Sequence, residues 1–211
     1  MAACQAEETN MPPRNPLCKT RNGYYNRGED CDSYTECRDY QAKEMQCPDG
    51  LHFDPKAVFP NYPCGYPMDV SCEGRGPPQP ARSTSECPHQ YGFFPSAQAK
   101  VEQCGAYRMC VEGHAIEMTC PVGLAFNPEI SRCDWPDLVP SCNADAYLGF
   151  KCPVAPLDKD GKLLIVNYKY ESNCYAFFSC EEGHARLLMC DAGFAFDPEA
   201  GRCVDADLVK C

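Results

Sequence analysis

The sequence has few cationic side chains and no long apolar run. Its 19 Lys and Arg residues are outnumbered by 30 Asp and Glu residues, which gives a formal net charge of −11. Binding to a phosphate backbone depends on clustered Lys and Arg, so this balance argues against a nucleic-acid partner. The longest aliphatic stretch covers only residues 163–166, whereas a membrane-spanning helix needs roughly 18 apolar residues or more. We therefore expect neither a nucleic acid nor a membrane as a partner.

Patterns that indicate catalysis or metal binding are also scarce. The chain contains 4 histidines, and two of them, His114 and His184, occur in the same EGHA segment, where a turn residue is expected. Structural zinc sites usually place cysteines about two to four residues apart, and this sequence has no such pair. Modules of about 60 residues also leave little room for a deep catalytic cleft. We expect no catalytic residue, no metal and no cofactor, and hence no enzyme.

Cysteine and proline, by contrast, are abundant, with 19 and 20 residues respectively. Such chains are typically built from small disulfide-linked units. A unit of about 60 residues buries too little apolar surface to offset chain entropy, so disulfides that restrict the unfolded chain are needed to stabilise it. So many thiols pair stably only in an oxidising compartment, which predicts a secreted protein. The first 13 residues lack the apolar core of a signal peptide, so we expect a mature or recombinant product whose signal is not part of this sequence.

Apart from Cys4, the cysteines form three consecutive groups of six. In each group the second and third cysteines enclose five residues, and the third and fourth enclose nine. The segments CPDGLHFDP, CPVGLAFNP and CDAGFAFDP begin at the fourth cysteine of each group. One unit is therefore repeated three times. The expected parts are an N-terminal tail (1–14), a first module (15–74), a Pro-rich linker (75–83), a second module (84–144), a short linker (145–148) and a third module (149–211).

Each module is predicted to consist of short antiparallel hairpins. Gly113 and Gly183 lie midway between the third and fourth cysteines of their groups, where a tight turn tolerates a positive φ. After the fourth cysteine, alternating apolar residues precede an Asn-Pro or Asp-Pro turn that leads back to the fifth cysteine. The predicted fold class is small, disulfide-rich and mostly β, with three tandem modules of short hairpins. Prolines should make the first linker extended and stiff.

The six-cysteine spacing, the GLHFDP, GLAFNP and GFAFDP segments, and CDWP at residues 133–136 resemble the peritrophin-A type (type 2) chitin-binding domain. The three-module arrangement resembles the obstructor-type cuticular proteins analogous to peritrophins. Six cysteines permit fifteen pairings, and the resemblance implies first with third, second with sixth, and fourth with fifth. The implied bridges are Cys18–Cys37, Cys31–Cys72, Cys47–Cys64, Cys87–Cys110, Cys104–Cys142, Cys120–Cys133, Cys152–Cys180, Cys174–Cys211 and Cys190–Cys203. Cys4 is left over, either as a remnant of a trimmed end or for an intermolecular disulfide.

The resemblance implies binding to chitin, a neutral polymer whose sugar rings stack on aromatic side chains and whose acetamide groups bond to polar ones. The candidate aromatic contacts are Trp135, Tyr66, Tyr24, Tyr25, Phe93 and Phe94, and the candidate polar contacts are Asp54, Asn127, Asp134 and Asp197. A module this small also needs core aromatics, for which the candidates are Tyr34, Tyr107, Phe177, Phe53, Phe126 and Phe196. The third module has no aromatic residue directly after Cys203, and Tyr168, Tyr170 and Phe178 are candidates to compensate.

These features predict a non-enzymatic extracellular matrix protein of arthropod cuticle that organises or cross-links chitin fibres through several weak sites. Partly deacetylated chitin and other matrix proteins are further candidate partners. Alternatives are a peritrophic-membrane protein of the gut lining, a recruiter of chitin-modifying enzymes, and a disulfide-rich inhibitor or ligand that only shares the scaffold. The Pro-rich linker carries few Ser and Thr residues, which favours cuticle over a mucin-like gut protein.

Overall fold

The computed structural model describes residues 13–28, 30–99 and 103–211. The chain divides into two compact units, one formed by residues up to 92 together with 110–114 and the other by 93–109 together with 115–211. Cys4 lies outside the described residues. Among those residues, no helix has the length and apolar character needed to cross a membrane.

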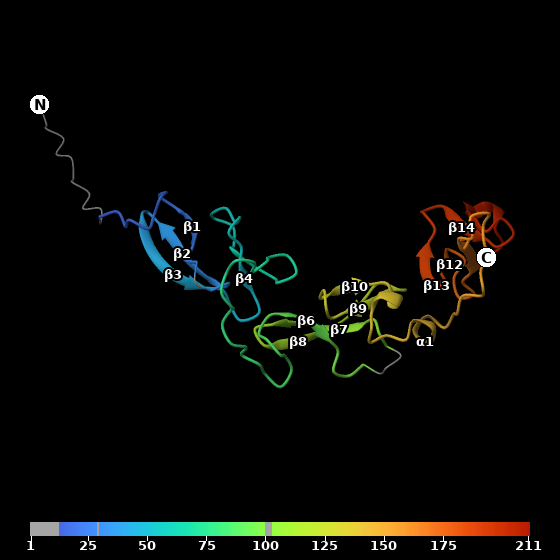
Figure 1. Ribbon diagram of the computed structural model, residues 1–211, viewed down its shortest axis with the longest axis horizontal. Coiled ribbons are helices and arrows are strands. Elements are labelled where there is room, and N and C mark those ends of the chain that lie inside the picture. The colour runs from blue at the N-terminus through green and yellow to red at the C-terminus, as the bar shows by residue number, and fades with distance from the viewer. Residues whose placement is uncertain (1–12, 29, 100–102) are drawn as a thin grey trace, which may run out of the picture. The chain divides into compact units, whose positions relative to one another are not determined.

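Each module contains a three-stranded antiparallel sheet followed by a two-stranded hairpin (Figure 1). The first has β1 (Gly23–Asn26), β2 (Ser33–Arg38) and β3 (Gln41–Gln46), then β4 (His52–Phe53) and β5 (Cys64–Gly65). The second has β6 (Gly92–Pro95), β7 (Ala106–Val111) and β8 (His114–Thr119), then β9 (Ala125–Asn127) and β10 (Arg132–Asp134). The third has β11 (Val166–Lys169), β12 (Ala176–Glu181) and β13 (His184–Met189), then β14 (Phe194–Asp197) and β15 (Arg202–Asp205). The predicted mostly β fold in three modules is confirmed, but the first strand of each module was not foreseen.

Two-residue turns join the long strands of each sheet. Residues Asp39–Tyr40, Glu112–Gly113 and Glu182–Gly183 all have positive φ angles. A type I′ turn requires this conformation at both central positions, and its twist matches that of the flanking strands. The turns expected at Gly113 and Gly183 are therefore present. His114 and His184 follow these turns as exposed first residues of β8 and β13.

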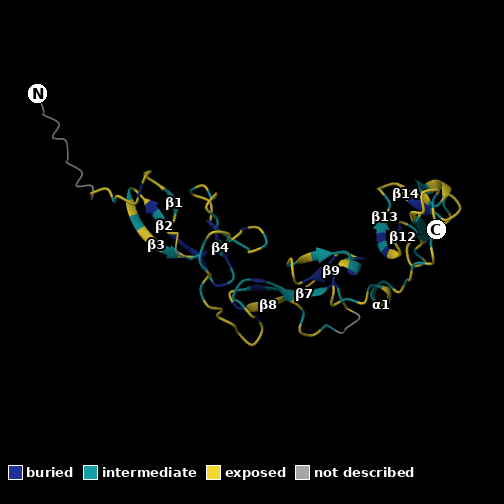
Figure 2. Ribbon diagram, in the orientation of Figure 1, coloured by how far each residue is buried: buried dark blue, intermediate teal, exposed yellow. Residues whose placement is uncertain are grey.

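A pair of stacked aromatic rings joins the sheet to the hairpin in every module. The ring centroids are 4.9 Å apart in each pair and the rings are nearly parallel, a geometry that adds to the stabilisation from burial. Four of the six rings are fully buried and all three residues of β9 are buried with them (Figure 2). The pairs are Tyr34–Phe53, Tyr107–Phe126 and Phe177–Phe196. The six candidate core aromatics thus do form the cores.

Nine disulfides close the modules. Within each module the first cysteine pairs with the third, the second with the sixth and the fourth with the fifth, which is the order that the family resemblance implies. The shortest loops, of 13 residues, belong to the hairpins of the second and third modules, and closing a loop of that size contributes roughly 3 kcal/mol. The bridges are Cys18–Cys37, Cys31–Cys72, Cys47–Cys64, Cys87–Cys110, Cys104–Cys142, Cys120–Cys133, Cys152–Cys180, Cys174–Cys211 and Cys190–Cys203.

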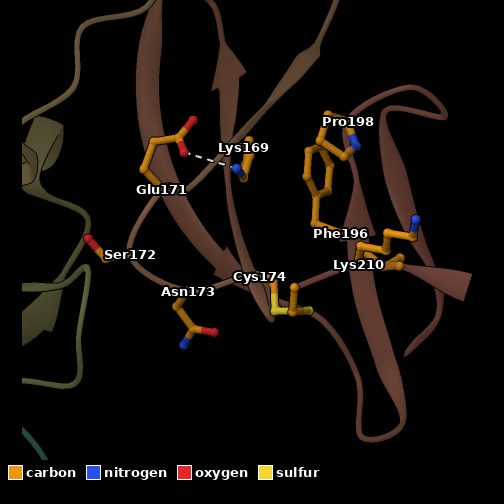
Figure 3. A pocket seen from close by; sticks show the side chains of 10 residues that line it. Lys169, Glu171, Ser172, Asn173, Cys174, Phe196, Pro198 and Lys210 are labelled. Atoms are coloured by element: carbon orange, nitrogen blue, oxygen red, sulfur yellow. Dashed lines mark hydrogen bonds and ion pairs between the residues drawn. A yellow bond between two sulfur atoms is a disulfide. The ribbon is translucent and has the colours of Figure 1, made fainter. Parts of the chain in front are cut away.

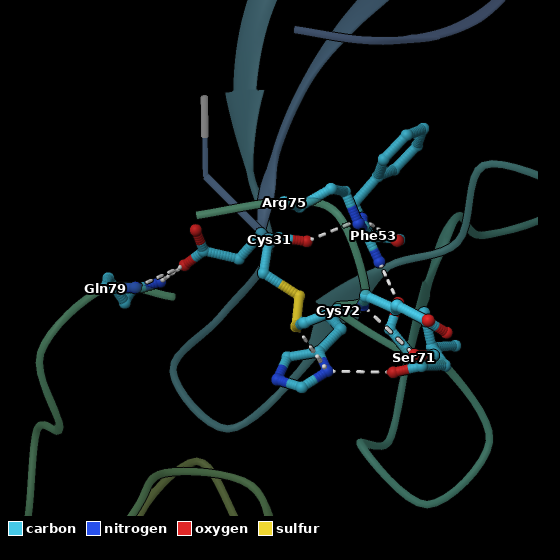
Figure 4. The surroundings of a disulfide bond; sticks show 10 residues. Cys31, Phe53, Ser71, Cys72, Arg75 and Gln79 are labelled. Atoms are coloured by element: carbon cyan, nitrogen blue, oxygen red, sulfur yellow. Dashed lines mark hydrogen bonds between the residues drawn. A yellow bond between two sulfur atoms is a disulfide. The ribbon is translucent and has the colours of Figure 1, made fainter. Parts of the chain in front are cut away.

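The Pro-rich linker is anchored to the first module by hydrogen bonds, several of which appear in Figure 4. Nη1 of Arg75 donates to the carbonyls of Cys31 and Phe53, at 2.9 and 2.6 Å. The backbone N–H and the side-chain amide of Gln79 both donate to the carboxylate of Asp32 at 3.0 Å. Asp32 is fully buried, and these bonds satisfy its Oδ2, while its Oδ1 has no hydrogen-bond partner among the described residues. The linker is therefore held by specific contacts as well as stiffened by its prolines.

The segment expected as a second, short linker is helical. Helix α1 (Ala144–Leu148) begins where the Asn143 side chain accepts a hydrogen bond from the N–H of Ala146, and it ends at Gly149, which has a φ of 64°. The hydroxyl of Tyr147 donates to the carbonyl of Leu124 at 2.9 Å. This segment is therefore attached to the second module. Two 3₁₀ turns, η1 (Pro136–Leu138) and η2 (Ala206–Leu208), follow the small hairpins of the second and third modules.

Candidate functional site

The first module presents two of the candidate tyrosines on β1, an edge strand of its sheet. Tyr24 contacts Tyr34 edge to face, with centroids 5.8 Å apart, and Phe59 at 5.7 Å. The hydroxyl of Tyr25 accepts the N–H of Thr20 at 2.9 Å and lies 2.7 Å from its Oγ1. Tyr24, Tyr25 and Phe59 are all half-buried. These rings are fixed by the protein and still reach the surface, as a sugar-stacking platform requires.

An open cavity of about 520 Å³ lies beside these rings, between residues 20–25 and residues 57–59. Burial raises the pKa of the Tyr24 hydroxyl, and the nearby Glu36 carboxylate raises it further. Burial also raises the pKa of Tyr34 to about 12. Both phenols therefore stay protonated at neutral pH and can donate hydrogen bonds.

Tyr66, the other candidate platform of the first module, lies against the core. Its ring is half-buried and contacts the buried cluster that contains Tyr34, Leu51 and Phe53. Its backbone carbonyl accepts the N–H groups of Asp69 and Val70. Tyr66 therefore supports the hairpin and exposes only part of its ring.

In the second module, Trp135 directly follows β10 and is half-buried. Oδ1 of Asp134 accepts the backbone N–H of Trp135 at 2.8 Å. The guanidinium of Arg186, on β13 of the third module, lies 5.3 Å from the centroid of the indole ring. Arg186 also pairs with Asp137, at 3.6 Å, and with Glu181, at 2.7 Å. The indole thus takes part in a cation–π contact with the third module, which sequence reasoning missed.

Phe93 and Phe94, the remaining aromatic candidates of this module, lie on β6. Both are half-buried. The ring of Phe93 lies 6.4 Å from that of Tyr107 in a tilted arrangement, which links it to the core stack of the module. The structure therefore places these two rings on the strand that corresponds to β1, where Tyr24 and Tyr25 lie in the first module.

Three of the polar candidates serve the hairpin turn in which they lie. The side chains of Asp54, Asn127 and Asp197 each accept the backbone N–H two residues further on, at 2.9 to 3.0 Å. This Asx-turn explains why Asp or Asn precedes proline in all three repeats. Asn127 is only 5% exposed, so a polymer at the surface does not reach it. The Asx-turn signal was present in the sequence and could have been used to assign this structural role.

Of the aromatic candidates of the third module, Phe178 lies in its core, and Tyr168 and Tyr170 are half-buried rings that pack against it. Phe178 is buried and stacks on Phe150, with centroids 4.2 Å apart. Tyr170 contacts Phe178 edge to face, and Tyr168 contacts Phe150. The interpretation of Phe178 as an exposed platform is therefore wrong, because the stack removes its ring from solvent.

A cavity of about 400 Å³ next to β11 has a mixed, partly charged lining (Figure 3). Nζ of Lys169 pairs with Glu171 at 2.9 Å beside it, and Lys210 lies on another part of its wall. The aromatic ring in the lining belongs to Phe196, which is 2% exposed. This cavity therefore lacks the broad aromatic surface found in the first module.

Cys31, His52 and Cys72 form the cluster in the described chain whose atoms lie close enough to suggest a metal site. The two cysteines are joined in a disulfide, and Nδ1 of His52 lies 3.2 Å from Sγ of Cys72 and 2.9 Å from the carbonyl of Val70 (Figure 4). Metal binding needs thiolates, which a disulfide does not provide. The cluster is thus a disulfide with a histidine beside it.

Comparison with known proteins yields a family and several relatives. The chitin binding Peritrophin-A domain matches residues 18–72, 86–142 and 165–211. Protein obstructor-E of Drosophila melanogaster is 42% identical over 209 residues, which cover 95% of this chain and 83% of that protein. Peritrophin-1 of Anopheles gambiae is 32% identical over 114 residues, or 52% of this chain and 72% of that protein. The chitin-binding domain protein cbd-1 of Caenorhabditis elegans is 34% identical over 127 residues, or 59% of this chain and 9% of that protein. With three matches that together span most of its length, one in each module, the chain belongs to the chitin binding Peritrophin-A domain family.

Proposed function

We propose that this chain is a non-enzymatic, chitin-binding protein of the arthropod extracellular matrix. The observation that carries the proposal is the threefold match to one chitin-binding domain family. Half-buried aromatic rings on β1 and β6 support it, because such rings are held rigidly and still offer a face to a sugar. The similarity to obstructor-E and Peritrophin-1 points to arthropods.

The chain binds the polymer through several weak contacts that act together. Stacking one ring on a sugar contributes roughly 1 to 2 kcal/mol, which by itself gives only weak affinity. Modules in one chain raise each other's effective concentration at a repetitive polymer, so the array binds much more tightly than one module. We place the main contacts in the first two modules, because Phe178 of the third module is buried and Tyr168 and Tyr170 pack against its core. The exposed rings of the third module are those of Tyr175 and Phe194.

Cuticle is the proposed site of action, and the protein organises or cross-links chitin fibres there. The linker that joins the first two modules contains only Ser83, Thr84 and Ser85 as hydroxyl residues in residues 73–86. Mucin-like proteins of a gut lining carry long Ser/Thr-rich segments for glycosylation. This difference favours cuticle over the peritrophic membrane, although Peritrophin-1 remains a relative over half of this chain.

The experiment that tests this proposal is sedimentation of the full chain with chitin beads, with cellulose beads as the control. Cellulose has the same sugar backbone without acetamide groups, so the comparison isolates recognition of the acetamide. We expect depletion from solution by chitin and little depletion by cellulose. If chitin does not deplete the protein, a disulfide-rich inhibitor or secreted ligand that shares the scaffold becomes the better account.

A further inference from the structure

The hairpin of the first module is longer than those of the other two. The fourth and fifth cysteines enclose 16 residues in the first module and 12 in each of the others. The additional residues belong to the segment 56–63, which we call the insertion. Within it, Ala57, Val58 and Phe59 line the cavity of about 520 Å³ whose opposite wall is formed by residues 20–25.

The insertion adds an aromatic wall to the cavity beside β1. The ring of Phe59 lies 5.7 Å from that of Tyr24 at an interplanar angle of 50°, so the two rings are in contact and tilted relative to each other. The guanidinium of Arg38 lies 5.7 Å from the centroid of Phe59. Phe59 is half-buried, which leaves part of its ring accessible. A flat sugar ring can therefore contact aromatic carbon on one side and the aliphatic atoms of Ala57 and Val58 on another.

The charges around the cavity favour a neutral ligand. Among the described residues that line the cavity, Arg21 is the one with a formal charge. Its guanidinium already pairs with Asp39 at 2.6 Å, and Arg38 pairs with Glu36 at 2.8 Å. The ammonium group of a glucosamine unit would thus meet guanidinium groups and carboxylates that are already paired. An ammonium group there would lose hydration without gaining an unpaired carboxylate, whereas an acetamide carries no charge to desolvate.

Polar partners for an acetamide are available at the same place. Because β1 is an edge strand, alternate backbone N–H and C=O groups of β1 face away from β2. The hydroxyls of Thr20 and Tyr25 are 2.7 Å apart, and because the Thr20 hydroxyl donates to the Asn22 carbonyl, this pair offers acceptors at the cavity. The amide and carbonyl of an acetamide need one acceptor and one donor, and this edge supplies both kinds.

We propose that the insertion and β1 form a saccharide subsite, specific to the first module, that prefers N-acetylglucosamine units over deacetylated glucosamine units. This inference rests on the proposed chitin-binding function and adds to it the location of a site and its ligand class. Phe59 and Tyr24, whose rings contact each other, provide the stacking surface, and the Tyr25 hydroxyl provides a polar contact. The second and third modules, whose hairpins are shorter, do not have this subsite.

The test is a titration of the full chain with soluble sugar hexamers, followed by NMR of backbone amides. The N-acetylglucosamine hexamer should shift the amides of residues 20–25 and 57–59, and the glucosamine hexamer should leave them nearly unchanged. Phe59→Ala should weaken this subsite by about tenfold, the loss expected for one stacked ring. Tyr62→Ala is the matched control, because Tyr62 is an exposed ring of the same insertion outside the cavity lining, and it should bind as the wild type does.

A second variant tests the charge argument without risk to the fold. Val58 is 70% exposed, so Val58→Glu adds a carboxylate to the cavity without disturbing the core. This variant should bind the glucosamine hexamer more tightly than the wild type does.

The outcomes separate this inference from the proposed function. If the chain binds neither chitin beads nor the acetylated hexamer, the proposed function fails. If it binds chitin beads but residues 20–25 and 57–59 do not shift, or Phe59→Ala binds like the wild type, the subsite is wrong and the proposed function stands. Equal shifts with both hexamers would overturn the preference for acetylated units.

Discussion

The carboxylate of Asp49, in the hairpin region of the first module, lies 2.6 Å from Nδ1 of His89 near the start of the second module. Asp49 is 2% exposed and also accepts the backbone N–H groups of Arg82 and Gln90, at 2.7 and 3.1 Å. One buried carboxylate therefore holds the end of the Pro-rich linker and the residues that follow Cys87. All of these residues belong to the first compact unit.

Acid should weaken this junction. Burial by itself would raise the pKa of Asp49, but the hydrogen bonds from His89, Arg82 and Gln90 outweigh it, so the pKa lies below its ordinary value. A carboxylate with a lowered pKa in the folded state contributes stability above its unfolded pKa of about 4 and loses it as the pH falls through the folded value. We expect the difference in melting temperature between wild type and Asp49→Asn to be largest near neutral pH and to shrink below about pH 4. Calorimetry across that range measures it, and a difference independent of pH would contradict the assignment.

The anchored linker should resist proteolysis. Trypsin cleaves after arginine, and Arg82 lies in the anchored segment. Gln79→Ala removes the side-chain amide that bonds to the Asp32 carboxylate and to the Cys47 carbonyl. Hydrogen bonds to a charged group contribute roughly 1.5 to 3 kcal/mol. Without this bond the linker should detach from the module more often, and cleavage after Arg82 should become at least about tenfold faster. Mass spectrometry of timed digests measures the rate.

Gln98→Ala is the control for this digestion, because Gln98 is exposed in the second module and outside the linker. It should be cleaved at the wild-type rate. Equal cleavage rates for wild type and Gln79→Ala would mean that the linker is not held.

Trp135 and Arg186 should have separable roles. Arg186→Ala removes the cation–π contact and leaves the nearly buried carboxylate of Asp137 without its cation. We expect the free energy of unfolding of the second compact unit to fall by about 1 to 2 kcal/mol, with little change in chitin binding. Trp135→Ala should lower both stability and retention on chitin. Denaturant unfolding and bead retention of the two variants measure these effects, and unchanged retention of Trp135→Ala would leave Trp135 with a packing role alone.

A single module should bind chitin much less tightly than the array. Residues 13–74 contain the first module with its three disulfides, and 84–144 contain the second. Each should be retained on a chitin column at least about tenfold more weakly than the full chain, because the gain from linked modules is lost. Equal retention of one module and of the full chain would rule out multivalent binding.

Local features of this molecule were accessible from the sequence, and contacts between distant residues were not. The cysteine spacing and the turn glycines reflect short-range geometry. The three modules, the hairpin between the two long strands of each sheet and the core aromatic residues could therefore be predicted. The contact of Arg186 with Trp135 and that of Asp49 with His89 join residues that are 51 and 40 positions apart. No periodic pattern indicates such pairs. β1 was missed because GYYN is only 4 residues long, and Phe178 was misassigned because its partner, Phe150, precedes the first cysteine of the third module.

The most direct test of the central claim is a binding isotherm of the full chain on chitin beads. The native, disulfide-bonded chain should bind saturably to chitin and only weakly to cellulose, and the reduced and alkylated chain should lose this binding because its modules depend on their disulfides. If the native chain binds chitin no better than cellulose, or no better than its reduced form, the account of a folded chitin-binding array is wrong.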